Sequence, residues 1–145
     1  MNSSEIISLL PHSKPFLFVD ELKEVSENGI TGTYFFPQDS FFYEGHFKNF
    51  PVTPGVILTE CMAQIGVVSL GIYLMAGKFS ESGKVAMTKT DVDFYLPVYP
   101  GEEVKVVSEK QFFRFNKLKC KVKMFNAAEK LVCRGEISGM IKEDE

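Results

Sequence analysis

The clearest pattern along the chain is a strict alternation of polar and apolar residues over positions 119–124, Lys-Cys-Lys-Val-Lys-Met. Successive side chains of a strand point to opposite faces, so this segment predicts a half-buried strand with its lysines in solvent. Strand-like segments at 102–115 and 130–141 flank it, joined through short turns at 116–117 and 126–129. We expect these three strands to form an antiparallel meander, preceded by a further strand over 84–98.

The N-terminal part of the chain predicts a short helix, a hairpin and a long loop. Residues 3–10 are amphipathic, with Ser3 or Ser4 as the N-cap and Pro11 as the stop. Residues 16–25 and 30–36 are two strand-like runs separated by a polar turn. Residues 37–54 are irregular and rich in aromatic side chains, and loops of this length are often functional.

The longest apolar run, residues 56–76, is long enough to cross a bilayer. Glu60, Gln64 and three small residues within it are poorly suited to lipid, so we expect a helix buried in a soluble protein and no membrane partner. Such a helix needs cover on most sides, which a strongly curved antiparallel sheet would provide. The pattern therefore predicts an α+β hotdog fold in a single domain, residues 1–145.

Composition narrows the functional classes. Of 145 residues, 45% are hydrophobic, which is enough for a substantial core. The net charge of -3 argues against nucleic acid as the main partner. Three cysteines without a C-x-x-C pair and two histidines offer few ligands for a metal. The N-terminal residues lack the pattern of a secretory signal, so we expect a cytoplasmic protein.

The stretch EGHFKNFPVTPGVILTE, residues 44–60, carries the candidate chemistry. Pro54 and Gly55 are suited to open a helix, whose first amides favour negative charge and whose glycine lets a ligand approach the backbone. Glu60 follows about one and a half turns later and should seek a partner in its apolar surroundings. His46 is the natural candidate, because imidazole exchanges protons near neutral pH. An acid/base pair beside such a helix end suits enolate formation from a thioester.

Three segments resemble the 3-hydroxyacyl-(acyl-carrier-protein) dehydratases of fatty acid synthesis, the FabZ/FabA type of hotdog enzyme. They are LPHSKPFLFVD (10–20), EGHFKNFPVTPGVILTECMAQ (44–64) and DVDFYLPVYPGEEV (91–104). The resemblance implies that His46 is the catalytic histidine, Glu60 the catalytic carboxylate and Gly55 the source of an oxyanion-binding amide. The spacing of His46 and Glu60, and glutamate rather than aspartate at position 60, are similar to the FabZ branch, which mainly dehydrates.

The same resemblance implies the reaction and its partners. Water leaves a 3-hydroxyacyl thioester to give a trans-2-enoyl thioester, in fatty acid synthesis or a related polyene or pigment pathway. No cofactor is implied, because an acyl carrier protein brings the phosphopantetheine arm with the substrate. The implied assembly is a homodimer or a trimer of dimers, with His46 of one subunit beside Glu60 of the other. Phe50 and residues 94–96 depart from the usually basic positions of the family, which favours a dedicated carrier.

Other residues have a structural and a functional interpretation. Gln64 shares a helix face with Glu60 and either holds that carboxylate or a water, or satisfies a core polar group. Phe94 and Tyr95 either line an acyl channel or pack in the sheet. His12 is interpreted as part of a turn that shapes the entrance, and Cys61 as a small buried hydrophobe rather than a nucleophile. The remaining candidate substrate contacts are Phe47, Pro54 and Val56.

Two rival functions share the predicted fold. In a hotdog thioesterase, Glu60 would activate water against the thioester carbonyl. In a non-catalytic subunit of a larger synthase, the chain would only bind an acyl carrier. A fold hosts many activities and does not decide among these. The Gly-His-Phe, Pro-Gly and Glu spacing favours dehydration over hydrolysis. The retention of both proton-transfer residues argues against a non-catalytic subunit.

Overall fold

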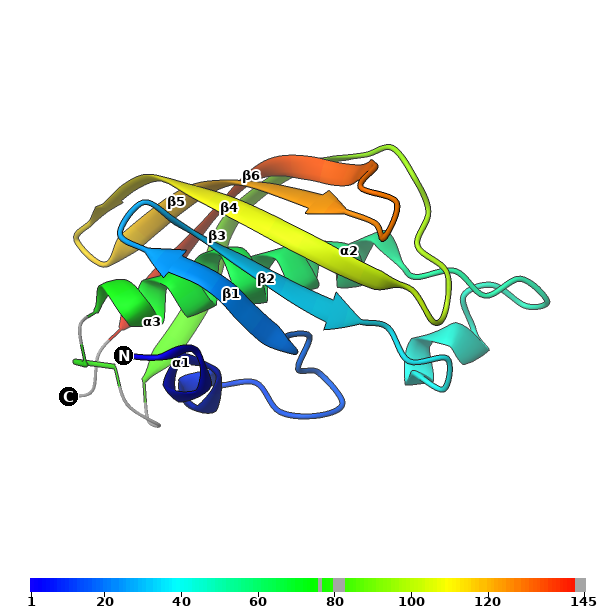
Figure 1. Cartoon of the computed structure of the whole chain (residues 1–145), viewed down its shortest axis with the longest axis horizontal. Helices are drawn as coiled ribbons and strands as arrows, with labels where there is room; N and C mark the ends of the chain where they lie inside the picture. Colours follow the sequence, from blue (N-terminus) through cyan, green and yellow to red (C-terminus); the bar gives the residue numbers. More distant parts are fainter. Residues whose placement is uncertain (76, 80–82, 143–145) are drawn as a thin grey trace.

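The computed structural model describes residues 1–75, 77–79 and 83–142, and these residues form the predicted hotdog fold. Six antiparallel strands make one curved sheet in the order β1-β2-β4-β5-β6-β3. The sheet bends around a central helix but does not close, so β1 and β3 are its edges (Figure 1). The helix therefore packs on the concave face, and the convex face is exposed.

The central helix runs from Gly55 to Leu74 in three consecutive parts. These are α2 (Gly55–Ala63), the π-helical segment η2 (Gln64–Ser69) and α3 (Leu70–Leu74). Its length and composition would suit a membrane span, but 78% of its most apolar window is buried inside the protein. This confirms the sequence-based interpretation of a core helix.

Two glycines let the central helix approach the sheet closely. A Cβ on Gly66 would lie 3.0 Å from the Ser108 Cβ, and one on Gly71 would overlap the Ile141 side chain. The Ser108 hydroxyl donates a 2.8 Å hydrogen bond to the Gly66 carbonyl and so links helix and strand directly. Small residues in the apolar run therefore mark where the helix touches the sheet.

The C-terminal strands follow the prediction closely. The meander consists of β4 (Glu103–Arg114), β5 (Lys117–Phe125) and β6 (Leu131–Lys142). On β5 the apolar residues from Leu118 to Met124 are buried, while Lys121 and Lys123 are exposed and Lys119 is half-buried. The remaining strand, β3 (Lys84–Phe94), ends four residues earlier than predicted. There the amides of Tyr95 and Leu96 both donate to the Val132 carbonyl, which interrupts the regular ladder.

The first hairpin is shorter than predicted. Its strands are β1 (Glu21–Ser26) and β2 (Gly29–Phe35), so residues 16–20 lie outside the sheet. The prediction of a strand from residue 16 was wrong because the backbone of Phe16 and Phe18 bonds to the Gln64 side chain instead of a neighbouring strand.

The N-terminal helix α1 (Ser3–Leu9) begins one residue away from the expected cap. Its N-cap is Asn2, whose side chain accepts a 2.9 Å hydrogen bond from the Glu5 amide. Ser3 and Ser4 therefore do not cap it, and the Ser3 hydroxyl donates to the Leu22 carbonyl of β1. This bond ties α1 to the edge of the sheet.

The long loop before the central helix contains one 3₁₀ turn, η1 (Phe41–Glu44). Figure 1 shows the following residues extending past the N-terminal end of α2, away from the body of the sheet. This loop holds the predicted His46, whereas Glu60 lies on the helix beneath the sheet.

Candidate active site

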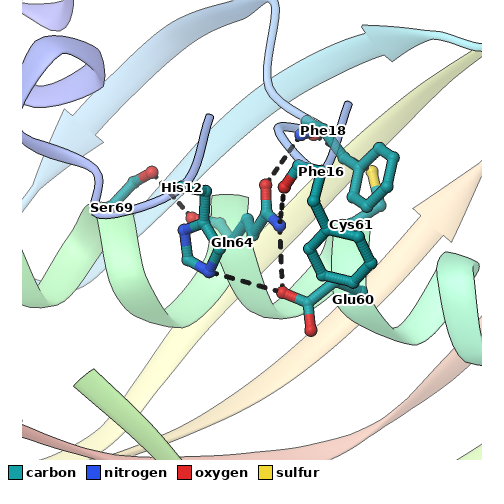
Figure 2. Close-up of polar contacts among 7 residues, drawn as sticks. All are labelled: His12, Phe16, Phe18, Glu60, Cys61, Gln64 and Ser69. Atoms are coloured by element: carbon teal, nitrogen blue, oxygen red, sulfur yellow. Dashed lines mark hydrogen bonds and ion pairs between the residues drawn. The ribbon is translucent and has the colours of Figure 1, made fainter. Parts of the chain in front are cut away.

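Glu60 is held by Gln64, one helical turn further along the central helix (Figure 2). The Gln64 Nε2 donates to the Glu60 Oε2 at 2.9 Å and to the Phe16 carbonyl at 3.0 Å. The Gln64 Oε1 accepts from the Phe18 amide at 2.7 Å. This fully buried amide therefore has both roles that the sequence left open: it satisfies core backbone groups and it fixes the carboxylate.

His12 reaches Glu60 from the irregular segment after α1. Its Nε2 lies 3.6 Å from the Glu60 Oε2, and the two side chains are 18% and 22% exposed. Its Nδ1 is buried without a hydrogen-bond partner among the described residues. Burial lowers the pKa of the His12 imidazole below its usual value, an effect that the Glu60 carboxylate partly opposes.

The sequence-based interpretation missed this contact, because it assigned His12 only to a turn at the entrance. The available signal was its position in segment 10–20, which resembles the same family as the segment that contains Glu60. Nothing in the local pattern shows that the two segments meet.

A cavity of about 210 Å³ begins at His12 and Glu60 and runs between the central helix and strands β3 and β6. Apart from these two residues its walls are mostly apolar, and they include Val67, Val85 and Ile137. A hydrocarbon chain with a polar group at one end suits such a lining. Glu60 would then lie beside the polar end of the chain.

His46 has a different environment in the loop after η1. Its Nδ1 lies 3.0 Å from the Val52 carbonyl, and its ring stacks on Phe47 at a centroid distance of 4.1 Å. A carbonyl oxygen only accepts, so Nδ1 carries the proton and the Nε2 of the neutral ring is left as a base. The Phe47 side chain is 58% exposed. In the described part of the chain, no hydrogen bond or ion pair joins His46 to Glu60.

The N-terminus of α2 forms a third part of the site. The Pro54 carbonyl accepts from the amides of Ile57 and Leu58, at 3.0 and 3.1 Å, so the amides of Gly55 and Val56 precede the first helical bonds. Val56 is 77% exposed, so its side chain lies at the surface of this helix end and not in the core.

Phe94 and Tyr95, two predicted substrate contacts, lie beside this helix end. With Gly55 they line a second cavity, of about 280 Å³. A Cβ on Gly55 would lie 3.3 Å from the Phe94 ring, so a larger residue there would press on the aromatic wall. Phe94 and Tyr95 are each 48% exposed, and most residues of the edge strand β3 are exposed as well.

The cysteines do not offer a nucleophile. Cys61 is fully buried, and burial raises the pKa of its thiol well above the usual value. Its sulfur lies 3.5 Å from the Phe18 carbonyl. These observations agree with its interpretation as a small core residue. Among the described residues, no group of three His, Cys, Asp or Glu side chains is placed to hold a metal ion.

Comparison with known proteins gives curated relatives over almost the whole chain. A protein named 3-hydroxyacyl-[acyl-carrier-protein] dehydratase FabZ from Clostridium perfringens is 32% identical over 141 residues, which cover 94% of this chain and 96% of the relative. A protein of the same name from Clostridioides difficile is also 32% identical, with 94% of both chains covered.

Solved structures show the same fold at low sequence identity. The dehydratase heterocomplex ApeI:P from Xenorhabdus doucetiae matches with a TM-score of 0.78 at 13% identity, over 97% of this chain and 91% of that chain. A thioesterase from Haemophilus influenzae matches with a TM-score of 0.60 at 16% identity, over 85% and 78% of the two chains. The family model described as FabA-like domain matches residues 10–138. The chain therefore belongs to the FabA-like family of hotdog proteins.

Proposed function

We propose that this protein dehydrates 3-hydroxyacyl thioesters, carried by an acyl carrier protein, to trans-2-enoyl thioesters. The observation that carries the proposal is a carboxylate, Glu60, held beside a mostly apolar cavity. The curated relatives named as FabZ dehydratases support the same reaction. The acyl chain occupies the cavity, and carbon 3 of the substrate lies beside Glu60.

In this reaction His46, Gly55 and Glu60 have separate roles. The Nε2 of His46 takes the proton from carbon 2, and the electrons move toward the thioester carbonyl. The amide of Gly55 stabilises the enolate oxygen at the positive end of the helix. Glu60 gives a proton to the hydroxyl on carbon 3, the carbon–oxygen bond breaks and water leaves. Proton exchange with solvent restores both groups, so the reaction needs no metal or organic cofactor.

The site is shared between two copies of the chain in this proposal. Glu60 lies on α2, whereas His46 lies in the loop after η1, and Figure 1 shows this loop extending past the N-terminal end of α2. Strand β3 is an unpaired edge of the sheet, available to pair with the same strand of a second copy. A homodimer, or a trimer of such dimers, then places His46 of one subunit beside Glu60 of the other.

The carrier protein is the second partner. Phe50 is 59% exposed and Tyr95 48% exposed near the loop and the helix end, where a basic surface would otherwise receive an acidic carrier. We propose a dedicated carrier that docks mainly through apolar contacts, in the cytoplasm.

The deciding experiment is product analysis with a 3-hydroxyacyl thioester loaded on a carrier protein. Dehydration gives an enoyl thioester and no free thiol, whereas a thioesterase releases the thiol and a free acid. The thioesterase match does not favour hydrolysis, since at 16% identity it shows the fold alone. Free thiol as the main product would overturn the proposal. Tight carrier binding without turnover would also overturn it, in favour of a non-catalytic binding subunit.

A further inference from the structure

His12 is the one imidazole beside Glu60 in the described chain, and the proposed reaction gives it no role. It lines the start of the apolar cavity, where its Nε2 faces the same carboxylate oxygen that accepts from Gln64. Figure 2 shows both contacts converging on Oε2, while Oε1 points away from His12 and Gln64. The two oxygens of Glu60 therefore have different surroundings.

The protonation of His12 follows from its two nitrogens. A proton on Nδ1 would leave a buried donor without an acceptor and would turn the Nε2 lone pair toward the carboxylate. An unmade hydrogen bond of a buried donor is costly, and two lone pairs facing each other repel. A proton on Nε2 leaves Nδ1 as an unpaired acceptor, but it removes the lone-pair repulsion and aims a donor at Oε2. Burial also disfavours the charged form of the ring and so lowers the pKa of His12.

We propose that His12 is a positioning residue for Glu60: its Nε2–H and the Gln64 amide together hold Oε2 and leave Oε1 to carry the transferred proton. This inference rests on the proposed dehydration. A neutral carboxylic acid with its proton on Oε1 still accepts at Oε2, so the same two donors fit Glu60 before and after the transfer. The Oε1–H proton passes to the substrate hydroxyl, which leaves as water.

The 3.6 Å separation of the His12 Nε2 and the Glu60 Oε2 is longer than a hydrogen bond. Catalytic contacts often shorten only when substrate is bound. Closure of the gap would bring the Oε2 atom between two donors and fix the rotation of the carboxyl group. A misplaced proton donor lowers the turnover rate more than it lowers substrate affinity.

The first test reads the tautomers directly, without turnover. The chain has two histidines, and the structure gives them opposite tautomers: Nε2–H for His12, and Nδ1–H for His46 with its Val52 bond. Long-range nitrogen–proton NMR spectra of the ¹⁵N-labelled protein at about pH 8, where imidazoles are ordinarily neutral, distinguish the two. The variants H12Q and H46A assign the rings. An Nδ1–H tautomer at His12 would overturn the proposal.

The second test compares two His12 variants with amide side chains, H12Q and H12N, in their turnover of the 3-hydroxyacyl thioester. The side-chain nitrogen of H12Q reaches the Nε2 position, whereas that of H12N reaches the Nδ1 position. We expect H12Q to keep kcat within about threefold of wild type and H12N to lose about tenfold or more, with KM changed less than about twofold. Equal losses in both variants, or a loss confined to KM, would show that His12 only fills space.

The two tests separate this inference from the proposed function. If no 3-hydroxyacyl thioester is dehydrated but the two tautomers are opposite, the proposed reaction fails. The assignment of His12 as a donor to the Glu60 Oε2 then still stands. If dehydration is observed but the two amide variants behave alike, only the role of His12 is wrong.

Discussion

The two histidines of this protein differ in which ring nitrogen is engaged. In the loop, His46 donates from Nδ1 to the Val52 carbonyl, which leaves Nε2 free to accept a proton. Beside the helix, His12 has Nε2 directed at Glu60 and its Nδ1 is buried. The two imidazoles thus present different nitrogens to their partners, Nδ1 in the loop and Nε2 beside the helix.

This contrast extends to the surroundings of each residue. Glu60, next to His12, is fixed by a buried amide that links the helix to residues 16–18. His46 lies in a loop whose aromatic neighbours Phe47 and Phe50 are 58% and 59% exposed. Glu60 has contacts with Gln64 and His12 of its own chain, whereas the loop around His46 exposes its aromatic residues at the surface. A difference of this kind is expected where a second subunit completes the site.

The largest expected effect comes from removing either proton-transfer group. We expect H46A and E60Q each to lower the dehydration rate by about 10² to 10⁴, because each removes one general acid or base. Steady-state assays on a carrier-bound 3-hydroxyacyl thioester measure this, with circular dichroism as a check of folding. The matched control is E44Q, which neutralises an exposed carboxylate near His46 and should leave the rate unchanged. Near wild-type turnover by a folded H46A or E60Q protein would refute the assigned roles.

Mixing the inactive H46A and E60Q variants tests whether His46 and Glu60 of one active site come from different subunits. After subunit exchange, about half of the dimers combine H46A with E60Q, and each such dimer has one intact site of two. We therefore expect recovery of about a quarter of the wild-type activity per subunit. Exchange is verified by mass spectrometry of differently labelled chains. Complete exchange without recovered turnover would indicate that each chain builds its own site.

Loss of the buried amide should affect stability as well as activity. In Q64M the Phe18 amide and the Phe16 carbonyl lose their partner, so we expect the free energy of unfolding to fall by about 1 to 3 kcal/mol. Urea unfolding at fixed protein concentration measures this change. The control Q111M replaces an exposed glutamine of β4 and should change stability by less than about 0.5 kcal/mol. Equal effects of both substitutions would contradict a structural role for the Gln64 bonds.

The smallest expected effect is the change of kcat/KM with salt, which tests carrier docking at the exposed loop around Phe50. A docking surface short of basic residues lacks electrostatic steering, so kcat/KM on the dedicated carrier should change only about twofold between low and moderate salt. The variant F50R introduces a positive charge within the loop and should make turnover on an acidic carrier more salt-sensitive. A carrier encoded beside this protein should also outperform the housekeeping carrier. Faster turnover on the housekeeping carrier with a steep loss on adding salt would contradict apolar docking.

Hydrophobic periodicity by itself determined most of the fold. The alternation on β5, the two flanking strands and the long apolar helix depend on local burial patterns, which repeat within a few residues. The family-like segments also directed attention to His46, Glu60 and Gly55 as candidates. Their catalytic roles remain predictions until the variants are assayed.

Only the tertiary structure decided how the site is assembled. Residues 16–18 resemble a strand, yet their backbone bonds to Gln64, a residue more than forty positions away. His12 looks like part of a turn, yet the path of the chain after α1 brings it to Glu60. Hydrophobic periodicity records which side chains are buried but not which buried polar groups meet. Those pairings depend on the packing of distant segments, because each buried donor and acceptor must find a partner in three dimensions.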